Sequence, residues 1–304
     1  MAVRDVSARV RRIPQEPGRR VTFSRVASSG DDRSLAGRII AGGLAFVWLL
    51  ISVVPIYYMV TVSLRRQQDL FTTSPWALPI PATLENYRLV FAGGIARYFV
   101  NSVIVTVVSV FVIVTVCLLA AYAIVRRRSR LTNAMFGFAL FGLAIPIQAT
   151  IIPMFFVMTY IKLYDSLLAL ILPSIAFGIP ISILILVNFL RDIPRELFES
   201  MQVDGAGSGR VLWHLVTPLA KPALLTITFY NGLLVWNNFL FPLILTQDKS
   251  LQTLPLALFT LQGDYSINIP ALMAAVTVSA IPMILLYAIG QRHLVAGLTA
   301  GFGK

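Results

Sequence analysis

The stretch that decides the fold lies between two long apolar runs and reads, from Glu199 to Pro222, ESMQVDGAGSGRVLWHLVTPLAKP. It carries Asp204-Gly205-Ala206 near its centre, and Pro218 and Pro222 precede the next apolar run. A short loop suffices to join two membrane-spanning helices. A longer ordered connection therefore indicates a surface that docks to another molecule.

The composition of the whole chain is that of an integral membrane protein. Hydrophobic residues make up 57% of it, charged residues only 12%, and the mean hydropathy is +0.80. A soluble domain of this length needs more charged surface. Six uncharged segments exceed the roughly 20 residues that cross a bilayer, and we expect one transmembrane helix in each: 40–61, 98–125, 134–161, 166–190, 222–247 and 265–291. The uncharged run 250–263 is too short to span and is interpreted as an interfacial or loop segment.

The basic residues predict the orientation of these six helices. With both termini in the cytoplasm, 19 of the 25 Lys and Arg residues fall in cytoplasmic segments and six fall outside. The run from Arg126 to Arg130 favours this orientation most strongly, whereas Arg65 and Arg66 oppose it. The net charge of +12 is then explained by topology, without a nucleic-acid partner.

The predicted organisation is a multi-pass protein of the cytoplasmic membrane in three parts. Residues 1–39 form a basic tail, interpreted as a positive-inside anchor in contact with membrane lipid. Residues 40–292 form the six-span domain, which includes the polar loop 191–221 between spans four and five. Residues 293–304 form a cytoplasmic tail. The first apolar run is too long for a signal peptide.

Several chemical classes are disfavoured by what the sequence lacks. No GxxxxGK[ST] phosphate loop and no GxSxG elbow occur, so no catalytic residues are assigned. Two histidines and one cysteine, Cys117, do not form a metal-binding pattern. No predicted span carries a charge, which argues against self-powered, ion-coupled transport.

Polar and helix-breaking residues mark the third, fourth and fifth spans. In the third span, Pro146 and Pro153 favour kinks and Gln148 needs a hydrogen-bonding partner. In the fourth span, Pro173, Gly178 and Pro180 predict an irregular helix. The polar residues of the fifth span are Tyr230, Asn231, Trp236, Asn237 and Asn238. A continuous helix would place Asn231 and Asn238 on one face. Amides and an aromatic ring suit a sugar pathway, and helix–helix packing is an equal alternative.

The polar loop reads as two short helices joined at a glycine. We expect Asp192 to cap the first helix, Pro194 to lie in its first turn, and Gly205 to end it in the left-handed conformation. A second helix, about 208–216, has Val211, Leu212 and Leu215 on one face. The two helices would form an amphipathic knob, residues 191–221, without an apolar partner in its own chain. We therefore expect its apolar face to bind in a groove on another protein. The alternative is a helix pair lying flat in the membrane interface.

This stretch resembles the EAA loop of ABC-importer permeases. Glu199, Gly205 and Pro218 match the family pattern, which sets a Gly and a Pro at fixed offsets from Glu-Ala-Ala. Ser200 and Met201 replace the two alanines, and Leu212 stands where many members have Phe. The residues that inherit contacts with a partner ATPase are Glu199, Asp204, Gly205, Ala206, Leu212, Leu215 and Pro218.

Three further stretches resemble the carbohydrate, maltose-type branch of this family. They are Ala144 to Pro153, Trp236 to Leu243 and Leu294 to Gly301. The C-terminal ending Phe302-Gly303-Lys304 departs from the family's common ending. The resemblance assigns Leu298, Thr299, Ala300 and Gly301 to an ATPase contact. It also makes Gln148 and the polar residues of span five candidates for the substrate pathway.

The resemblance implies the partners and the energy source. A second, similar permease would pair with this chain, and two cytoplasmic ATPases would bind ATP and magnesium, so this chain itself needs no cofactor. An extracytoplasmic binding protein would deliver a sugar, expected to be an oligosaccharide. The alternatives are an importer branch for amino acids, peptides or other small solutes, a channel, and a membrane scaffold or enzyme.

Overall fold

The computed structural model describes residues 35–127, 129–260 and 268–300, and these residues are largely helical. The chain divides into two compact units at residue 53. The described part of the first unit is the N-terminal portion of α1 (Leu35–Ser63), a helix with Pro55 inside it. The expected basic tail, residues 1–39, lies outside the described residues up to Ser34.

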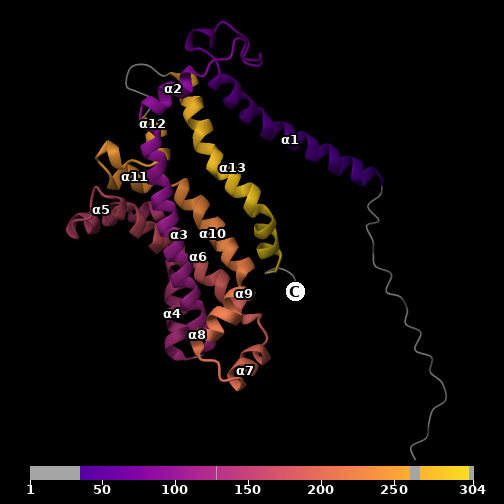
Figure 1. Cartoon of the computed structure of the whole chain (residues 1–304), viewed down its shortest axis with the longest axis vertical. Helices are drawn as coiled ribbons and strands as arrows, with labels where there is room; N and C mark the ends of the chain where they lie inside the picture. Colours follow the sequence, from indigo (N-terminus) through magenta and orange to yellow (C-terminus); the bar gives the residue numbers. More distant parts are fainter. Residues whose placement is uncertain (1–34, 128, 261–267, 301–304) are drawn as a thin grey trace, which may run out of the picture. The chain divides into compact units, whose positions relative to one another are not determined.

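The second unit is built on four long helices, α3 (Ile95–Arg126), α6 (Leu167–Arg191), α10 (Lys221–Trp236) and α13 (Ile269–Ala300). Helix α3 lies along α6, and α10 packs against α3 and α13 (Figure 1). The remaining elements are η1 (Gln67–Asp69), α2 (Glu85–Ala92), α4 (Arg130–Phe141), η2 (Gly142–Ala144), η3 (Ile147–Thr150), α5 (Ile151–Tyr160), α7 (Arg195–Val203), α8 (Ser208–Val211), the π-helix η4 (Leu212–Val216), α9 (Thr217–Leu219), α11 (Leu240–Leu245), η5 (Lys249–Leu251) and α12 (Leu254–Thr260).

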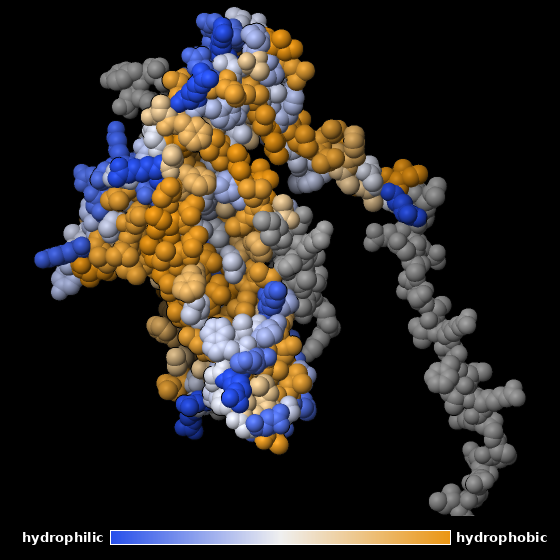
Figure 2. All heavy atoms as spheres, in the orientation of Figure 1, coloured by the Kyte–Doolittle hydropathy of each residue, from blue (hydrophilic) through white to orange (hydrophobic). Residues whose placement is uncertain are grey.

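The surface of the second unit carries the signature of a membrane environment. Hydrophobic residues cover the middle of the helical bundle, and hydrophilic residues gather around α7 and α8 and at the opposite end near α2 (Figure 2). Large apolar side chains such as Phe111 and Phe138 are 70% and 82% exposed. Four described helices are long and apolar enough to cross a bilayer, and two bent helix pairs bring the number to as many as six.

The third predicted span is broken, as its prolines predict. Its two halves, 130–144 and 147–160, meet at 94°. Pro146 lies at the break with extended backbone angles, φ −69° and ψ 130°. Pro153 does not add the expected second kink, because it falls in the first turn of α5, where backbone N–H groups have no intrahelical partner.

The fourth predicted span contradicts the expectation of irregularity. Helix α6 is continuous from Leu167 to Arg191 despite Pro173, Gly178 and Pro180. Transmembrane helices tolerate Pro and Gly where neighbouring helices pack against them. Gly178 lies at such a contact, since an added Cβ would lie 2.4 Å from Ile113 Cδ1 and 2.5 Å from Asn231 Oδ1. Gly178 is therefore a contact point between helices. Pro180 likewise packs against Gly142 of the bent third span, where an added Cβ would lie 2.8 Å from its Cγ.

The fifth predicted span is not the single helix that the sequence suggested. Helix α10 ends at Trp236, and the short helix α11 begins at Leu240. The shared face expected for Asn231 and Asn238 is therefore wrong. Pro242 provides the physical reason, because its ring clashes with the carbonyl of Asn238 in a continuous helix. Asn238 instead accepts a hydrogen bond at Oδ1 from the Phe241 backbone N–H, at 3.1 Å.

Side-chain hydrogen bonds hold the loops that follow α1, α5 and α11. Arg65, only 4% exposed, donates to the carbonyls of Pro75 and Ala77. Asp165 Oδ1 accepts from the backbone N–H groups of Gln247 and Asp248, at 2.8 and 3.0 Å. Arg65, whose charge opposes the predicted membrane orientation, therefore has a local structural role. The uncharged run after Lys249 is not a span, and its described part forms η5 and α12.

Candidate coupling loop and translocation path

The candidate coupling loop starts where α6 ends. Asp192 is the C-terminal cap of α6, and Pro194 is the residue before α7. The expectation that Asp192 caps the following helix is therefore wrong. The physical reason is that α7 begins only at Arg195, directly after Pro194, whose fixed φ suits a helix start. Asp192 lies too far upstream to cap it.

Gly205 ends α7 in the conformation that the sequence predicts. Its φ is +72°, in the left-handed region. The Ala206 N–H donates to the Met201 carbonyl at 2.9 Å, and the Gly205 N–H donates to the Gln202 carbonyl at 3.0 Å. These two bonds define a Schellman motif, which satisfies carbonyls that the helix end leaves open. The motif fixes the direction in which the chain leaves α7.

The second half of the loop continues through a π-helix into α10. Thr217 Oγ1 donates to the Leu212 carbonyl at 2.9 Å across this turn. Pro218 and Pro222 follow, and the chain bends by 73° between the segments 208–219 and 221–236. The two prolines therefore mark a sharp change of direction, as expected. The structure places a π-turn where a plain second helix was predicted.

The apolar face of the loop has a partner within its own chain, which corrects the prediction of an unpartnered knob. Phe198, Val211, Leu212 and Val216 are buried and belong to one core cluster with residues of α3 and α6. Tyr122 of α3 also donates to the Ser208 carbonyl at 3.2 Å. The loop is thus packed against the ends of α3 and α6.

The exposed face of the loop is a mixture of carboxylates and large apolar side chains. Glu199, Asp204, Gly205 and Pro218 are exposed, Ala206 and Leu215 are half-buried, and Leu212 is buried. Val203 and Trp213, which sequence reasoning missed as site residues, are 88% and 62% exposed. Their sequence signal is weak, because each is a single apolar residue off the buried stripe. Tryptophan is enriched among the residues that contribute most to protein interfaces, so Trp213 is the stronger of the two candidates.

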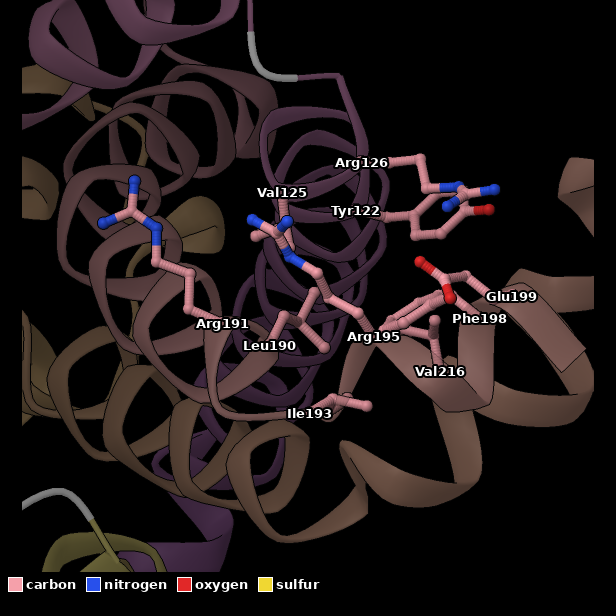
Figure 3. Close-up of a pocket in the computed structure, with 10 residues that line it drawn as sticks. All are labelled: Tyr122, Val125, Arg126, Leu190, Arg191, Ile193, Arg195, Phe198, Glu199 and Val216. Carbon is pink, nitrogen blue, oxygen red and sulfur yellow. The ribbon is translucent and has the colours of Figure 1, made fainter. Parts of the chain in front are cut away.

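A cavity of about 310 Å³ lies between the loop and the helix ends (Figure 3). Arg126 ends α3, Arg191 ends α6 and Arg195 begins α7. Glu199 is the one carboxylate on the cavity lining, beside apolar side chains from all three helices. The cavity is therefore basic and partly apolar.

The six candidate pathway residues differ in how exposed they are in this chain. Gln148, Tyr230 and Asn237 are exposed, and Asn238 is half-buried. Asn231 is 1% exposed and donates to Ser182 Oγ at 2.8 Å, which joins α10 to α6. Trp236 is 5% exposed and contacts Phe99 edge-to-face, with ring centres 5.7 Å apart. Both buried residues thus make helix–helix contacts.

The C-terminal candidates are only partly visible. Helix α13 begins at Ile269 and continues to Ala300, so Leu298, Thr299 and Ala300 lie in this helix. Gly301 lies outside the described residues.

In α3, Cys117 is fully buried, as expected for a packing residue.

Comparisons with known proteins identify the class. Residues 113–300 match the model of the family described as "Binding-protein-dependent transport system inner membrane component". ORF2 of Caldicellulosiruptor sp., described as an ABC transporter permease protein, is 39% identical, covering 85% of this chain and 94% of its own length. The diacetylchitobiose uptake system permease of Streptomyces coelicolor is 31% identical, covering 92% of each chain.

A solved structure agrees with this class. A chain of a bacterial ABC transporter that imports the acidic polysaccharide alginate superimposes with a TM-score of 0.76. It is 23% identical and covers 85% of this chain and 98% of its own length, which shows the shared fold. The protein belongs to the inner-membrane permease family of binding-protein-dependent ABC transporters. It is a transport subunit of the inner membrane.

Proposed function

We propose that this chain is the permease subunit of an ATP-driven importer that carries a sugar, specifically an oligosaccharide, across the cytoplasmic membrane. The observation that carries this proposal is the anchored loop, residues 191–221, in a chain of the permease family. Its apolar face is packed on α3 and α6, and its other face is exposed. The related diacetylchitobiose permease and the structurally similar alginate importer support a carbohydrate substrate.

The coupling mechanism follows from the loop's two faces. The exposed face, with Glu199, Asp204, Val203 and Trp213, docks on a cytoplasmic ATPase that binds ATP and magnesium. The buried face transmits the movement of that ATPase to the ends of α3 and α6. Because spanning helices are rigid over their length, displacement of their ends changes the packing along the path. The sequence contains no phosphate loop of its own, so the energy is supplied by the partner.

The proposed assembly contains a second, homologous permease, two ATPases and an extracytoplasmic binding protein. Both termini and the loop 191–221 face the cytoplasm, in accord with the distribution of basic residues. Gln148, Tyr230 and Asn237 are exposed in the single chain and are available to the path or to the second permease. The segment 298–301 contributes a further ATPase contact.

Uptake by the reconstituted complex tests this function. The complete transporter is placed in proteoliposomes with its binding protein outside and ATP inside, and radiolabelled oligosaccharides, amino acids and peptides are offered. We expect saturable, ATP-dependent accumulation of an oligosaccharide and none of the other solutes. ATP-dependent uptake of an amino acid or peptide, without uptake of any sugar, would contradict the proposed substrate class.

A further inference from the structure

Three arginines that form no ion pair with a described carboxylate line the cavity beside the loop 191–221. Among the described residues, no carboxylate forms an ion pair with Arg126, Arg191 or Arg195. Glu199 is the one carboxylate on the lining, so the group of four side chains has an excess of positive charge. Figure 3 shows the three side chains spread along the cavity, with Arg195 between Arg191 and Arg126. Unpaired arginines along one cavity attract an anion.

Two of these arginines are positioned in a way that leaves their donors available. The guanidinium carbon of Arg126 lies 5.8 Å from the centre of the Phe198 ring. That of Arg191 lies 5.1 Å from the centre of the Phe136 ring. Stacking on an aromatic face holds a guanidinium group while its N–H donors remain free. A planar fork of free donors matches the oxygens of a phosphate group.

Apolar side chains make up much of the remaining lining and indicate what carries the phosphate. Val125, Leu190 and Ile193 contribute to the walls, and Arg126 and Arg191 are the last residues of two spanning helices. A second cavity of about 330 Å³ shares Val125 and Arg191 with the first. A soluble anion uses only the arginines. A phospholipid also fills the apolar part, with its headgroup at the depth where the helices end.

We propose that this cavity binds the phosphate group of an anionic phospholipid from the cytoplasmic leaflet. Arg191 and Arg195 bind the phosphate, and Arg126, stacked on Phe198, adds to the positive potential of the cavity. The apolar walls contact the glycerol and the first part of the acyl chains. The assignment of the lipid to the cytoplasmic leaflet rests on the orientation given under the proposed function. The bound lipid would lie against both the loop and the helix ends, where it braces the coupling element.

Native mass spectrometry of the complete transporter, released from phosphatidylglycerol-containing nanodiscs, tests the proposal by counting retained lipids. We expect Arg191→Gln/Arg195→Gln to lose one phosphatidylglycerol per copy of this chain relative to wild type. The matched control Arg127→Gln/Arg130→Gln removes two nearby charges that do not line the cavity, and it retains the wild-type number. Equal retention by all three proteins would overturn the proposal.

Two single variants show whether a loss of lipid reflects the missing charge or a misfolded protein. Arg195→Gln alone changes one exposed residue and is expected to weaken retention partially in a complex that still elutes intact. Glu199→Gln removes the one carboxylate of the lining and is expected to increase retention. A loss of lipid in Glu199→Gln equal to that in the double arginine variant would contradict the electrostatic basis of the site.

A second arm separates a lipid from a free anion. The thermal unfolding midpoint of the complex is compared in phosphatidylcholine nanodiscs, with or without inorganic phosphate, and in nanodiscs that contain phosphatidylglycerol. We expect phosphatidylglycerol to raise the midpoint of wild type but not of the double variant, and phosphate to leave both unchanged. An arginine-dependent rise with phosphate alone would overturn the lipid assignment. The lipid count is independent of sugar uptake, so it stands or falls separately from the proposed function.

Discussion

Individual residues decide how the coupling loop folds, and their roles were predictable to different degrees. Gly205 was predicted in the left-handed conformation because Asp-Gly at the end of a helical stripe favours it, and the structure confirms a φ of +72°. The burial of Leu212 was not predictable, because the sequence does not reveal which surface its face meets. The structure places it against α3 and α6.

The backbone conformation of Gly205 gives the first prediction. Gly205→Pro requires a negative φ and removes an N–H that donates to Gln202, so ATP-dependent sugar uptake should be abolished while membrane insertion persists. Gly205→Ala should destabilise the loop by about 1–2 kcal/mol, the cost of a left-handed alanine. Gly207→Ala is the control, because Gly207 has ordinary backbone angles (φ −70°) and open space around it. Full uptake by Gly205→Pro would refute the coupling role.

Leu212 and Trp213, adjacent in sequence, give a second prediction because they differ in burial, at 6% and 62% exposed. Leu212→Ala should lower the free energy of unfolding by about 2–5 kcal/mol, because it leaves a cavity in the core. Trp213→Ala should leave the thermal midpoint unchanged and reduce stimulation of ATP hydrolysis by the loaded binding protein. The two effects are measured on the purified complex. The opposite pattern would show that Trp213 is the packing residue and Leu212 the contact.

At the scale of elements, the sequence located the spans better than it located their breaks. The apolar runs predicted the places of α1, α3, α6 and α13, because length and the absence of charge suffice for that. The break before α11 was missed, since the polar residues around Trp236 were placed on one helix. The continuity of α6 was also missed, because the effect of Gly178 and Pro180 depends on what packs against them.

Packing at Gly178 gives a prediction for the contact between α3, α6 and α10. Gly178→Ala places a methyl group against Ile113 and Asn231, which are 0% and 1% exposed and have little room to move. We expect destabilisation of about 1–3 kcal/mol from overpacking, measured as a lower thermal midpoint. Gly137→Ala in α4 is the control, because nothing lies within 4 Å of its added Cβ. Equal thermal midpoints for the two variants would contradict the tight helix packing around Gly178.

At the scale of the whole molecule, the family and the class of function were predictable from the sequence, and the orientation remains a prediction. Four separated motifs in the expected order carried the family resemblance, and the comparisons confirm the family. The substrate pathway was not predictable from one chain, because it is shared with the second permease in the proposed assembly. Asn231 and Trp236 illustrate this, since the sequence suited a sugar pathway and helix packing equally, and both side chains are buried against neighbouring helices.

Cysteine accessibility tests the proposed orientation. The chain has one cysteine, the buried Cys117, so Cys117→Ala provides a clean background. In intact cells, Ser74→Cys should react with a membrane-impermeant maleimide, whereas Ser208→Cys should react only after permeabilisation. Both serines are exposed, so the difference reports the side of the membrane. Labelling of Ser208→Cys in intact cells would show that the loop 191–221 faces the outside, which is the opposite of the proposed orientation.

The docking of the loop 191–221 on an ATPase is the central claim, and site-specific photo-crosslinking tests it most directly. A photoreactive amino acid replaces Val203, which is 88% exposed, in the tagged chain in its native membrane, and mass spectrometry identifies the adducts. The same probe at Ser74 serves as the control. The account predicts that the probe at position 203 crosslinks to a phosphate-loop ATPase and the probe at position 74 does not. Recovery of the ATPase in the same membranes, without any adduct at position 203, would contradict it.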